Sequence, residues 1–131
     1  MNKFDKRILI VDDEPDILEF ISYNLIRNGY NVFTASNGKE AYEKAVEVEP
    51  HLIILDVLMP VMNGYEACIQ MRRNPAFDNT IIVFLSALNE TNAKDFGLEL
   101  EADAFIGKPI RIELLLKRIE TWLKNSIPLP A

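Results

Sequence analysis

The chain has 131 residues, of which 49% are hydrophobic and 26% charged, and its formal net charge is −6. This length is typical of one domain with one core, and the composition excludes a disordered or fibrous protein. The negative charge argues against direct binding of DNA or RNA, which depends on neutralising phosphates. No apolar run is long enough to span a membrane, and the N-terminus lacks a secretory signal. The single cysteine, Cys68, excludes an internal disulfide and favours a reducing cytoplasm.

Apolar runs recur along the chain and are separated by segments with helical spacing. Most of these runs are continuous rather than alternating, which is typical of parallel strands that helices cover on both faces. The predicted strands lie at residues 8–11, 30–35, 52–55, 81–85 and 104–106.

The segments between these runs carry apolar stripes at helical spacing. The stripes are Ile17, Leu18, Ile21 and Leu25; Ala41, Ala45 and Val48; Tyr65, Cys68, Ile69 and Arg72; and Ile112, Leu115, Leu116, Ile119, Trp122 and Leu123. A further helix, over residues 91–100, is the weakest because Gly97 interrupts it. The alternation predicts an open α/β sheet with right-handed crossovers over residues 1–125, followed by a short tail at 126–131.

Charged and polar residues follow the predicted strands at the end where open α/β sheets bind ligands. Asp12 and Asp13 follow the first strand, Asp56 the third, Ser86 the fourth and Lys108 the fifth. Each has an ordinary alternative role: Asp12 or Asp13, for example, could cap the first helix. Together, however, three carboxylates repel one another unless a cation compensates, and Mg²⁺ prefers such oxygen ligands. With a lysine nearby, a site of this kind is suited to receive a phosphoryl group.

Two specific motifs contain these residues: D-x-x-M-P-x-x-x-G from Asp56 to Gly64, and the pair Lys108–Pro109. With the stretches ILIVDDEPD, IIVFLSA and ADAFIGKP, they make the chain resemble the receiver domain of two-component response regulators over about residues 6–125. The resemblance implies a flavodoxin-like fold, with a five-stranded parallel sheet in the order 2-1-3-4-5 and five helices. It also implies a signalling domain rather than a classical enzyme, one that catalyses only its own Mg²⁺-dependent phosphorylation and dephosphorylation.

The resemblance assigns a role to each site residue. Asp56 is expected to accept a phosphoryl group from a sensor histidine kinase or a histidine phosphotransfer protein. Asp12, Asp13, Asp56 and the backbone carbonyl of Leu58 are expected to bind Mg²⁺. Lys108 is expected to bind the phosphoryl group.

A switch is implied as well. Ser86 and Phe105 are expected to move when Asp56 is phosphorylated, which changes the surface of the fourth helix, fifth strand and fifth helix. That surface would then bind a downstream protein or a second copy of the chain. Pro109 is expected to follow a cis peptide bond.

The chain departs from the family pattern at Glu101, where Gly is usual, at Phe105, where Tyr is common, and at Ile110, where Phe is common. These departures affect the switch rather than the phosphorylation chemistry. Met59 and Met62 flank the loop after Asp56, where they either contact a kinase or pack against the loop.

Two other classes share this topology, and fold alone does not choose among them. A flavodoxin-type electron carrier needs a loop rich in Ser, Thr and Gly after the first strand, where the acids Asp12, Asp13 and Glu14 would repel a flavin phosphate. A haloacid dehalogenase phosphatase carries a D-x-D nucleophile motif there, whereas this chain has D-D-E-P-D. The acids, together with Asp56 and Lys108, favour the receiver. Two interpretations of its output remain. The chain is either a stand-alone receiver or the receiver portion of a longer regulator with a C-terminal output domain, such as a DNA-binding domain.

Overall fold

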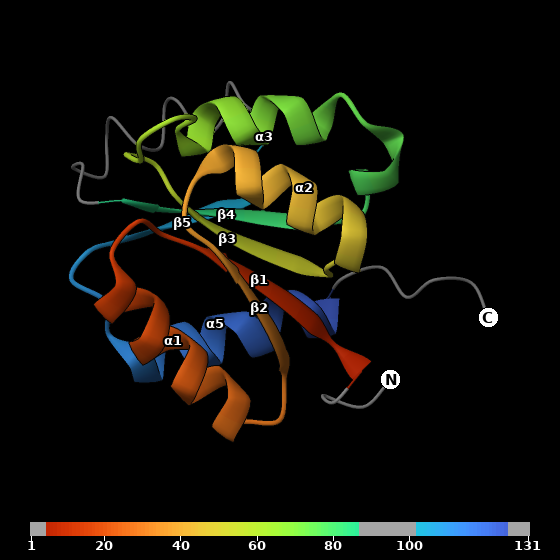
Figure 1. Ribbon diagram of the computed structural model, residues 1–131. Helices are drawn as coiled ribbons and strands as arrows, with labels where there is room; N and C mark the ends of the chain where they lie inside the picture. The colour runs from red at the N-terminus through yellow and green to blue at the C-terminus, as the bar shows by residue number, and fades with distance from the viewer. Residues whose placement is uncertain (1–4, 87–101, 126–131) are drawn as a thin grey trace.

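A single five-stranded parallel sheet forms the centre of the molecule, in a computed structural model that describes residues 5–86 and 102–125 (Figure 1). The strand order is β2-β1-β3-β4-β5, which confirms the predicted flavodoxin-like topology. The strands are β1 (Arg7–Val11), β2 (Asn31–Ala35), β3 (Leu52–Asp56), β4 (Ile81–Ser86) and β5 (Ala104–Gly107).

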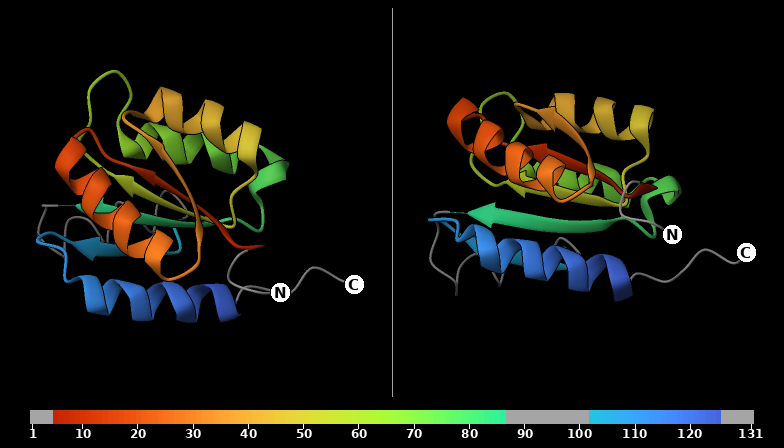
Figure 2. Two further views of the ribbon diagram at one scale, coloured as in Figure 1. Left: turned by 60° about the horizontal axis from the view of Figure 1, so that its bottom comes forward. Right: turned by 90° about the horizontal axis from the view of Figure 1, so that it is seen from below.

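Helices cover both faces of this sheet. α1 and α5 lie on one face, and α2 and α3 on the other, as Figures 1 and 2 show. Their bounds are α1 (Pro15–Arg27), α2 (Gly38–Val48), α3 (Gly64–Arg72) and α5 (Ile112–Asn125), with a short 3-10 helix at Pro75–Phe77. The helix expected over residues 91–100, Glu101 and the tail at 126–131 lie outside the described residues.

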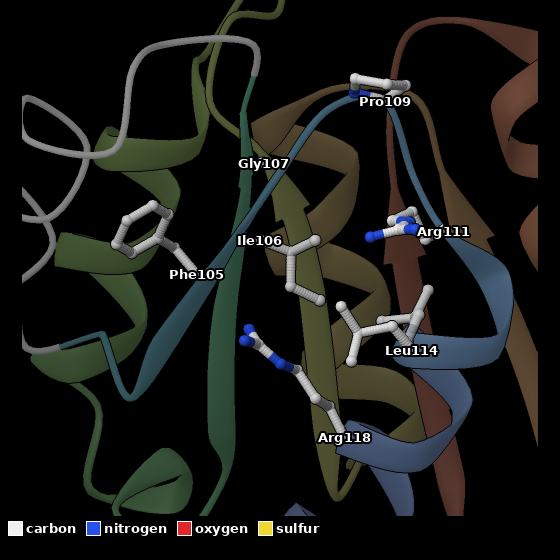
Figure 3. A pocket seen from close by; sticks show the side chains of 8 residues that line it. Phe105, Ile106, Gly107, Pro109, Arg111, Leu114 and Arg118 are labelled. Atoms are coloured by element: carbon white, nitrogen blue, oxygen red, sulfur yellow. The ribbon is translucent and has the colours of Figure 1, made fainter.

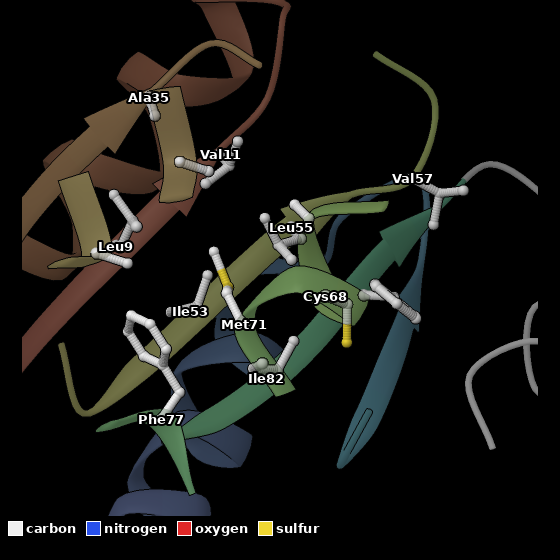
Figure 4. Close-up of a cluster of buried hydrophobic side chains, with 14 residues drawn as sticks. Leu9, Val11, Ala35, Ile53, Leu55, Val57, Cys68, Met71, Phe77 and Ile82 are labelled. Atoms are coloured by element: carbon white, nitrogen blue, oxygen red, sulfur yellow. The ribbon is translucent and has the colours of Figure 1, made fainter. Parts of the chain in front are cut away.

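Two apolar clusters hold the layers together, one on each face of the sheet. The cluster under α2 and α3 contains Leu9, Ile53, Leu55, Cys68, Met71 and Phe84 among others (Figure 4). The cluster under α1 and α5 includes Ile8, Ile10, Ile21, Leu25, Ile54 and Ile119. Every residue of β3 is buried, because β3 is the central strand and both of its faces are covered.

The stripe predicted for α3 is partly wrong. Cys68 is buried as expected, but Ala67 and Met71 are buried beside it, whereas Arg72 is not a core residue. The small residues Gly64 and Ala67 let α3 pack closely on the sheet, so the side of the helix that faces the sheet differs from the predicted one. Arg72 instead forms an ion pair with Asp103 at 2.8 Å and so holds the start of β5.

Neither Asp12 nor Asp13 caps α1. The N-cap of α1 is Glu14, which makes no side-chain cap bond, and Pro15 supplies the first turn. The alternative that Asp12 or Asp13 caps this helix is therefore wrong. One Asp12 oxygen accepts the Glu14 N–H at 2.9 Å, which holds the Asp12 carboxylate at the edge of the sheet.

Candidate functional site

Three carboxylates meet where β1 and β3 end. Val11 pairs with Leu55 in the parallel register, so that Asp12 and Asp56, one residue further on, lie side by side. One oxygen from each of Asp12, Asp13 and Asp56 lies within 4.8 Å of the others. Asp12 is fully buried and Asp56 is only 4% exposed, whereas Asp13 is exposed. The structure therefore brings together the acidic residues that the sequence analysis selected.

Lys108 reaches this cluster from the end of β5. Its Nζ lies 3.1 Å from Asp12 Oδ2, 3.5 Å from Asp56 Oδ2 and 3.7 Å from Glu14 Oε1. Its backbone N–H donates to the Ser86 carbonyl at 2.8 Å, which fixes the start of the loop that carries it. Glu14 was not among the predicted site residues, although its position directly after Asp12 and Asp13 in the sequence was the available signal.

The charges of the cluster perturb one another. Burial, followed by the neighbouring charge of Asp12, raises the pKa of Asp56 to about 6, although Lys108 opposes the shift. Burial alone would lower the pKa of Lys108, but the hydrogen bond to Asp12 and the charge of Asp56 leave it raised. One ammonium therefore does not fully compensate the three carboxylates. A hard divalent cation would complete the compensation, and this oxygen donor set fits Mg²⁺.

The start of α3 packs closely against the backbone at the end of β3. Gly64 donates its N–H to the Val57 carbonyl at 2.9 Å, and a Cβ at this glycine would lie 2.2 Å from the Asp56 carbonyl oxygen. Only glycine permits this approach of α3 to the end of β3. Leu58 lies in the loop between these elements with its side chain 60% exposed.

The residues expected to switch lie on the two strands next to this cluster. Ser86 ends β4 with 1% exposure and pairs with Gly107 of β5. Phe105 is half-buried on β5 and packs against the apolar cluster under α2 and α3. The Lys108–Pro109 peptide bond is cis, as expected.

The whole arrangement matches a known family. The sequence pattern of the response regulator receiver domain matches residues 8–120, which is most of the chain. The chain belongs to the response regulator receiver family. This membership confirms the resemblance found in the sequence and sets aside the flavodoxin and phosphatase alternatives.

Relatives of this receiver include longer proteins. The chain is 42% identical over 122 residues to the alkaline phosphatase synthesis transcriptional regulatory protein PhoP of Bacillus subtilis (strain 168), covering 93% of the chain and 50% of that protein. It is 34% identical to the DNA-binding dual master transcriptional regulator RpaA of Synechocystis sp. (strain ATCC 27184 / PCC 6803 / Kazusa), covering 95% of the chain and 52% of that protein. The receiver thus spans about half the length of these two relatives.

A solved structure supports the fold independently. The receiver superposes on the chemotaxis response regulator CheY4 of Vibrio cholerae with a TM-score of 0.84 and 34% identity, covering 89% of this chain and 98% of that one. Receiver domains are phosphoacceptor signalling domains rather than classical enzymes. Among the described residues, no helix of this receiver has the length and apolar character of a membrane span.

The receiver also has a hollow of about 250 Å³ between β5 and α5 (Figure 3). Ile106 and Leu114 point into it, and Arg111 and Arg118 border it, whereas the Phe105 ring points to the other side of β5. Leu114 is 46% exposed. This face therefore combines accessible apolar surface with two guanidinium groups.

Proposed function

We propose that this receiver is a phosphorylation-controlled switch in which Asp56 accepts a phosphoryl group from the phosphohistidine of a sensor histidine kinase or a histidine phosphotransfer protein. The observation that carries the proposal is the convergence of Asp12, Asp13 and Lys108 on Asp56, a nearly buried carboxylate at the ligand-binding edge of the sheet. A structural role alone does not require three carboxylates to be held within 4.8 Å of one another at a cost in repulsion.

Asp56 acts as the nucleophile. One of its carboxylate oxygens attacks phosphorus, the nitrogen–phosphorus bond of the phosphohistidine breaks, and the imidazole leaves with the bonding electron pair and takes up a proton. No base is needed, because with a pKa of about 6 Asp56 is mostly ionised near neutral pH. The product is an acyl phosphate. Its hydrolysis by water releases inorganic phosphate and restores the carboxylate.

Asp12, Asp13, Asp56 and the backbone carbonyl of Leu58 are the proposed ligands of Mg²⁺, which when bound neutralises the charge on the carboxylate and on the incoming phosphoryl oxygens. Lys108 already lies 3.5 Å from Asp56 Oδ2. After transfer, its ammonium can move from the carboxylate to a phosphoryl oxygen without a large displacement.

Ser86 and Phe105 are proposed to carry the signal from the acyl phosphate to the surface. The Ser86 hydroxyl would bind a phosphoryl oxygen, and the new contact biases the receiver toward a second conformation of β5 and its neighbours. The hollow between β5 and α5 belongs to the face expected to change, and its exposed Leu114 and two arginines suit a protein partner or a second copy of the chain.

The output is proposed to follow from protein contacts rather than from direct nucleic acid binding by this domain, whose net charge is −6. The names of PhoP and RpaA as transcriptional regulators support a version in which residues 1–125 form the receiver of a longer regulator with a DNA-binding output domain. A stand-alone receiver that binds a separate protein is the second version. In both versions we propose a cytoplasmic location, which the single cysteine, Cys68, supports.

Phosphorylation with a small-molecule donor tests the proposal. The protein is incubated with acetyl phosphate and Mg²⁺, and the modified residue is located by mass spectrometry. Asp56→Asn should remove the modification, whereas Asp78→Asn, at an exposed site outside the cluster, should leave it unchanged. Asp13→Ala should remove most of the Mg²⁺-dependent gain in thermal stability. Normal modification of the Asp56→Asn protein would contradict the proposal.

The switch has its own test. Beryllofluoride with Mg²⁺ mimics the phosphoryl group, and hydrogen exchange then reports which elements change. We expect the largest changes between Ser86 and Lys108 and small ones in α1 and α2 away from the site. Ser86→Ala should still accept the phosphoryl group on Asp56 while the change in β5 weakens. A strong response in α1 with none in β5 would contradict this switch.

A further inference from the structure

The first residue of α2 contacts the loop that follows Asp56. The Gly38 N–H donates to the carbonyl of Met62, in the loop between β3 and α3, at 2.8 Å. The first N–H groups of a helix have no partner within the helix. At α2, one of these donors is therefore satisfied by another element, which links the start of the helix to the loop beside the carboxylate cluster.

This contact leaves no space for a side chain on the glycine. A Cβ at Gly38 would lie 2.5 Å from the Met62 oxygen, 2.8 Å from Met62 Cγ and 3.0 Å from the Asn63 oxygen. Two of the three atoms are backbone oxygens, so that relief requires the loop or the helix to move. Glycine is thus required here for close approach rather than for a left-handed backbone.

The loop that Gly38 holds is strained. Val61, the residue before Met62, has φ of 69°, and the Met62 N–H donates to the Pro60 carbonyl at 2.7 Å across it. A turn this tight with a positive φ is costly, and more so for a β-branched residue. Such strain persists only where the surroundings hold it in place. The bond from Gly38 reaches the residue that directly follows the strained one.

We propose that Gly38 is a positioning residue for the metal site. By holding the strained turn at Val61, it keeps the preceding part of the loop, including the Leu58 carbonyl, in the conformation that binds Mg²⁺. This inference rests on the proposed function, in which that carbonyl is a ligand. The coupling is reciprocal. If the Gly38–Met62 hydrogen bond increases the affinity for Mg²⁺, then bound Mg²⁺ stabilises that hydrogen bond by the same factor.

Amide hydrogen exchange in the unmodified protein tests the coupling. The Gly38 N–H exchanges when its bond to Met62 opens. Saturating Mg²⁺ should slow its exchange severalfold, about fivefold if the bond is worth about 1 kcal/mol to the metal site. The Glu40 N–H is the internal control, because it lies in the same helical turn but donates to the Asn37 side chain at 2.9 Å. Its exchange should change little.

Two variants extend the test. Gly38→Ala should weaken Mg²⁺ binding, measured by calorimetry, about tenfold, whereas the rate of phosphorylation by acetyl phosphate should return to within about twofold at saturating Mg²⁺. Val46→Gly is the matched control: Val46 is 51% exposed on the same helix, so that this change lowers helix stability without reaching the loop. Its Mg²⁺ affinity should equal that of the unmodified protein.

The outcomes separate this inference from the proposed function. If Mg²⁺ binds the unmodified protein but leaves Gly38 exchange unchanged, or if Gly38→Ala and Val46→Gly weaken binding equally, Gly38 is not a positioning residue. If Mg²⁺ does not bind the unmodified protein at all, the proposed metal site is wrong and this inference with it.

Discussion

Replacing Asp56 by asparagine is expected to stabilise the metal-free protein near pH 7. Burial and the charge of Asp12 raise the pKa of Asp56 from 3.8 to about 6, because the folded protein disfavours the ionised carboxylate. A difference of about two pKa units corresponds to about 3 kcal/mol of folding free energy. Asparagine keeps the shape of the side chain and carries no charge, so that the variant avoids most of this cost.

The expected pH dependence has a definite sign. Below about pH 4, Asp56 is protonated in both the folded and the unfolded protein, and the two proteins should be about equally stable. Between about pH 4 and 6, the folded state binds more protons at Asp56 than the unfolded state does, so the unmodified protein loses stability as pH rises. Above about pH 6 the difference should stay near its full value of about 2–3 kcal/mol.

Urea unfolding in the presence of a chelator measures this difference at pH 4 and pH 7. Asp78→Asn is the control for loss of one negative charge, since Asp78 is exposed and lies outside the cluster. Adding Mg²⁺ should reduce the difference in stability between Asp56→Asn and the unmodified protein, because the ion stabilises only the protein that binds it. If Asp56→Asn were no more stable at pH 7 than at pH 4 relative to the unmodified protein, burial and repulsion of the Asp56 carboxylate would not destabilise the folded state.

Three further predictions concern the site and the opposite edge of the sheet. Gly64→Ala should destabilise the fold by about 3 kcal/mol or more in thermal denaturation, because the new Cβ would meet backbone at 2.2 Å, whereas Gly107→Ala, with nothing within 4 Å, should cost far less. Lys108→Met should cost about 2 kcal/mol at pH 7 in urea unfolding, since it leaves buried carboxylates uncompensated; an unchanged midpoint would contradict this. The pKa of His51 is lowered first by burial and then by the charge of the Arg7 side chain, and the Arg7 backbone N–H donates to His51 Nδ1 at 3.0 Å. Because the folded protein disfavours the protonated imidazole, stability should be highest above about pH 6.5 and should fall as pH drops below that value. His51→Gln should make the free energy of unfolding depend less on pH below about 6.5.

The sequence by itself determined the class of fold and the chemistry of its edge. Continuous apolar runs alternating with helical stripes predict a parallel sheet covered on both faces, and parallel strands place all their carboxyl ends at one edge. Asp12, Asp13, Asp56 and Lys108 follow strands of that sheet, so their convergence could be inferred without coordinates. The stripe of α3 was only partly predicted, because close packing of Gly64 and Ala67 decides which side of this short helix faces the sheet.

Tertiary structure alone decided how these groups act on one another. The pKa of Asp56 depends on its burial and on the distance to Asp12, neither of which a linear pattern contains. In the sequence, Gly38 looks like an ordinary helix boundary, and its contact with Met62 exists only because α2 and α3 pack side by side on one face. Local residue preferences set the elements and the side of the sheet on which ligands bind. Interactions of a few ångströms between distant segments depend on packing, and packing sets the charge state and shape of the site.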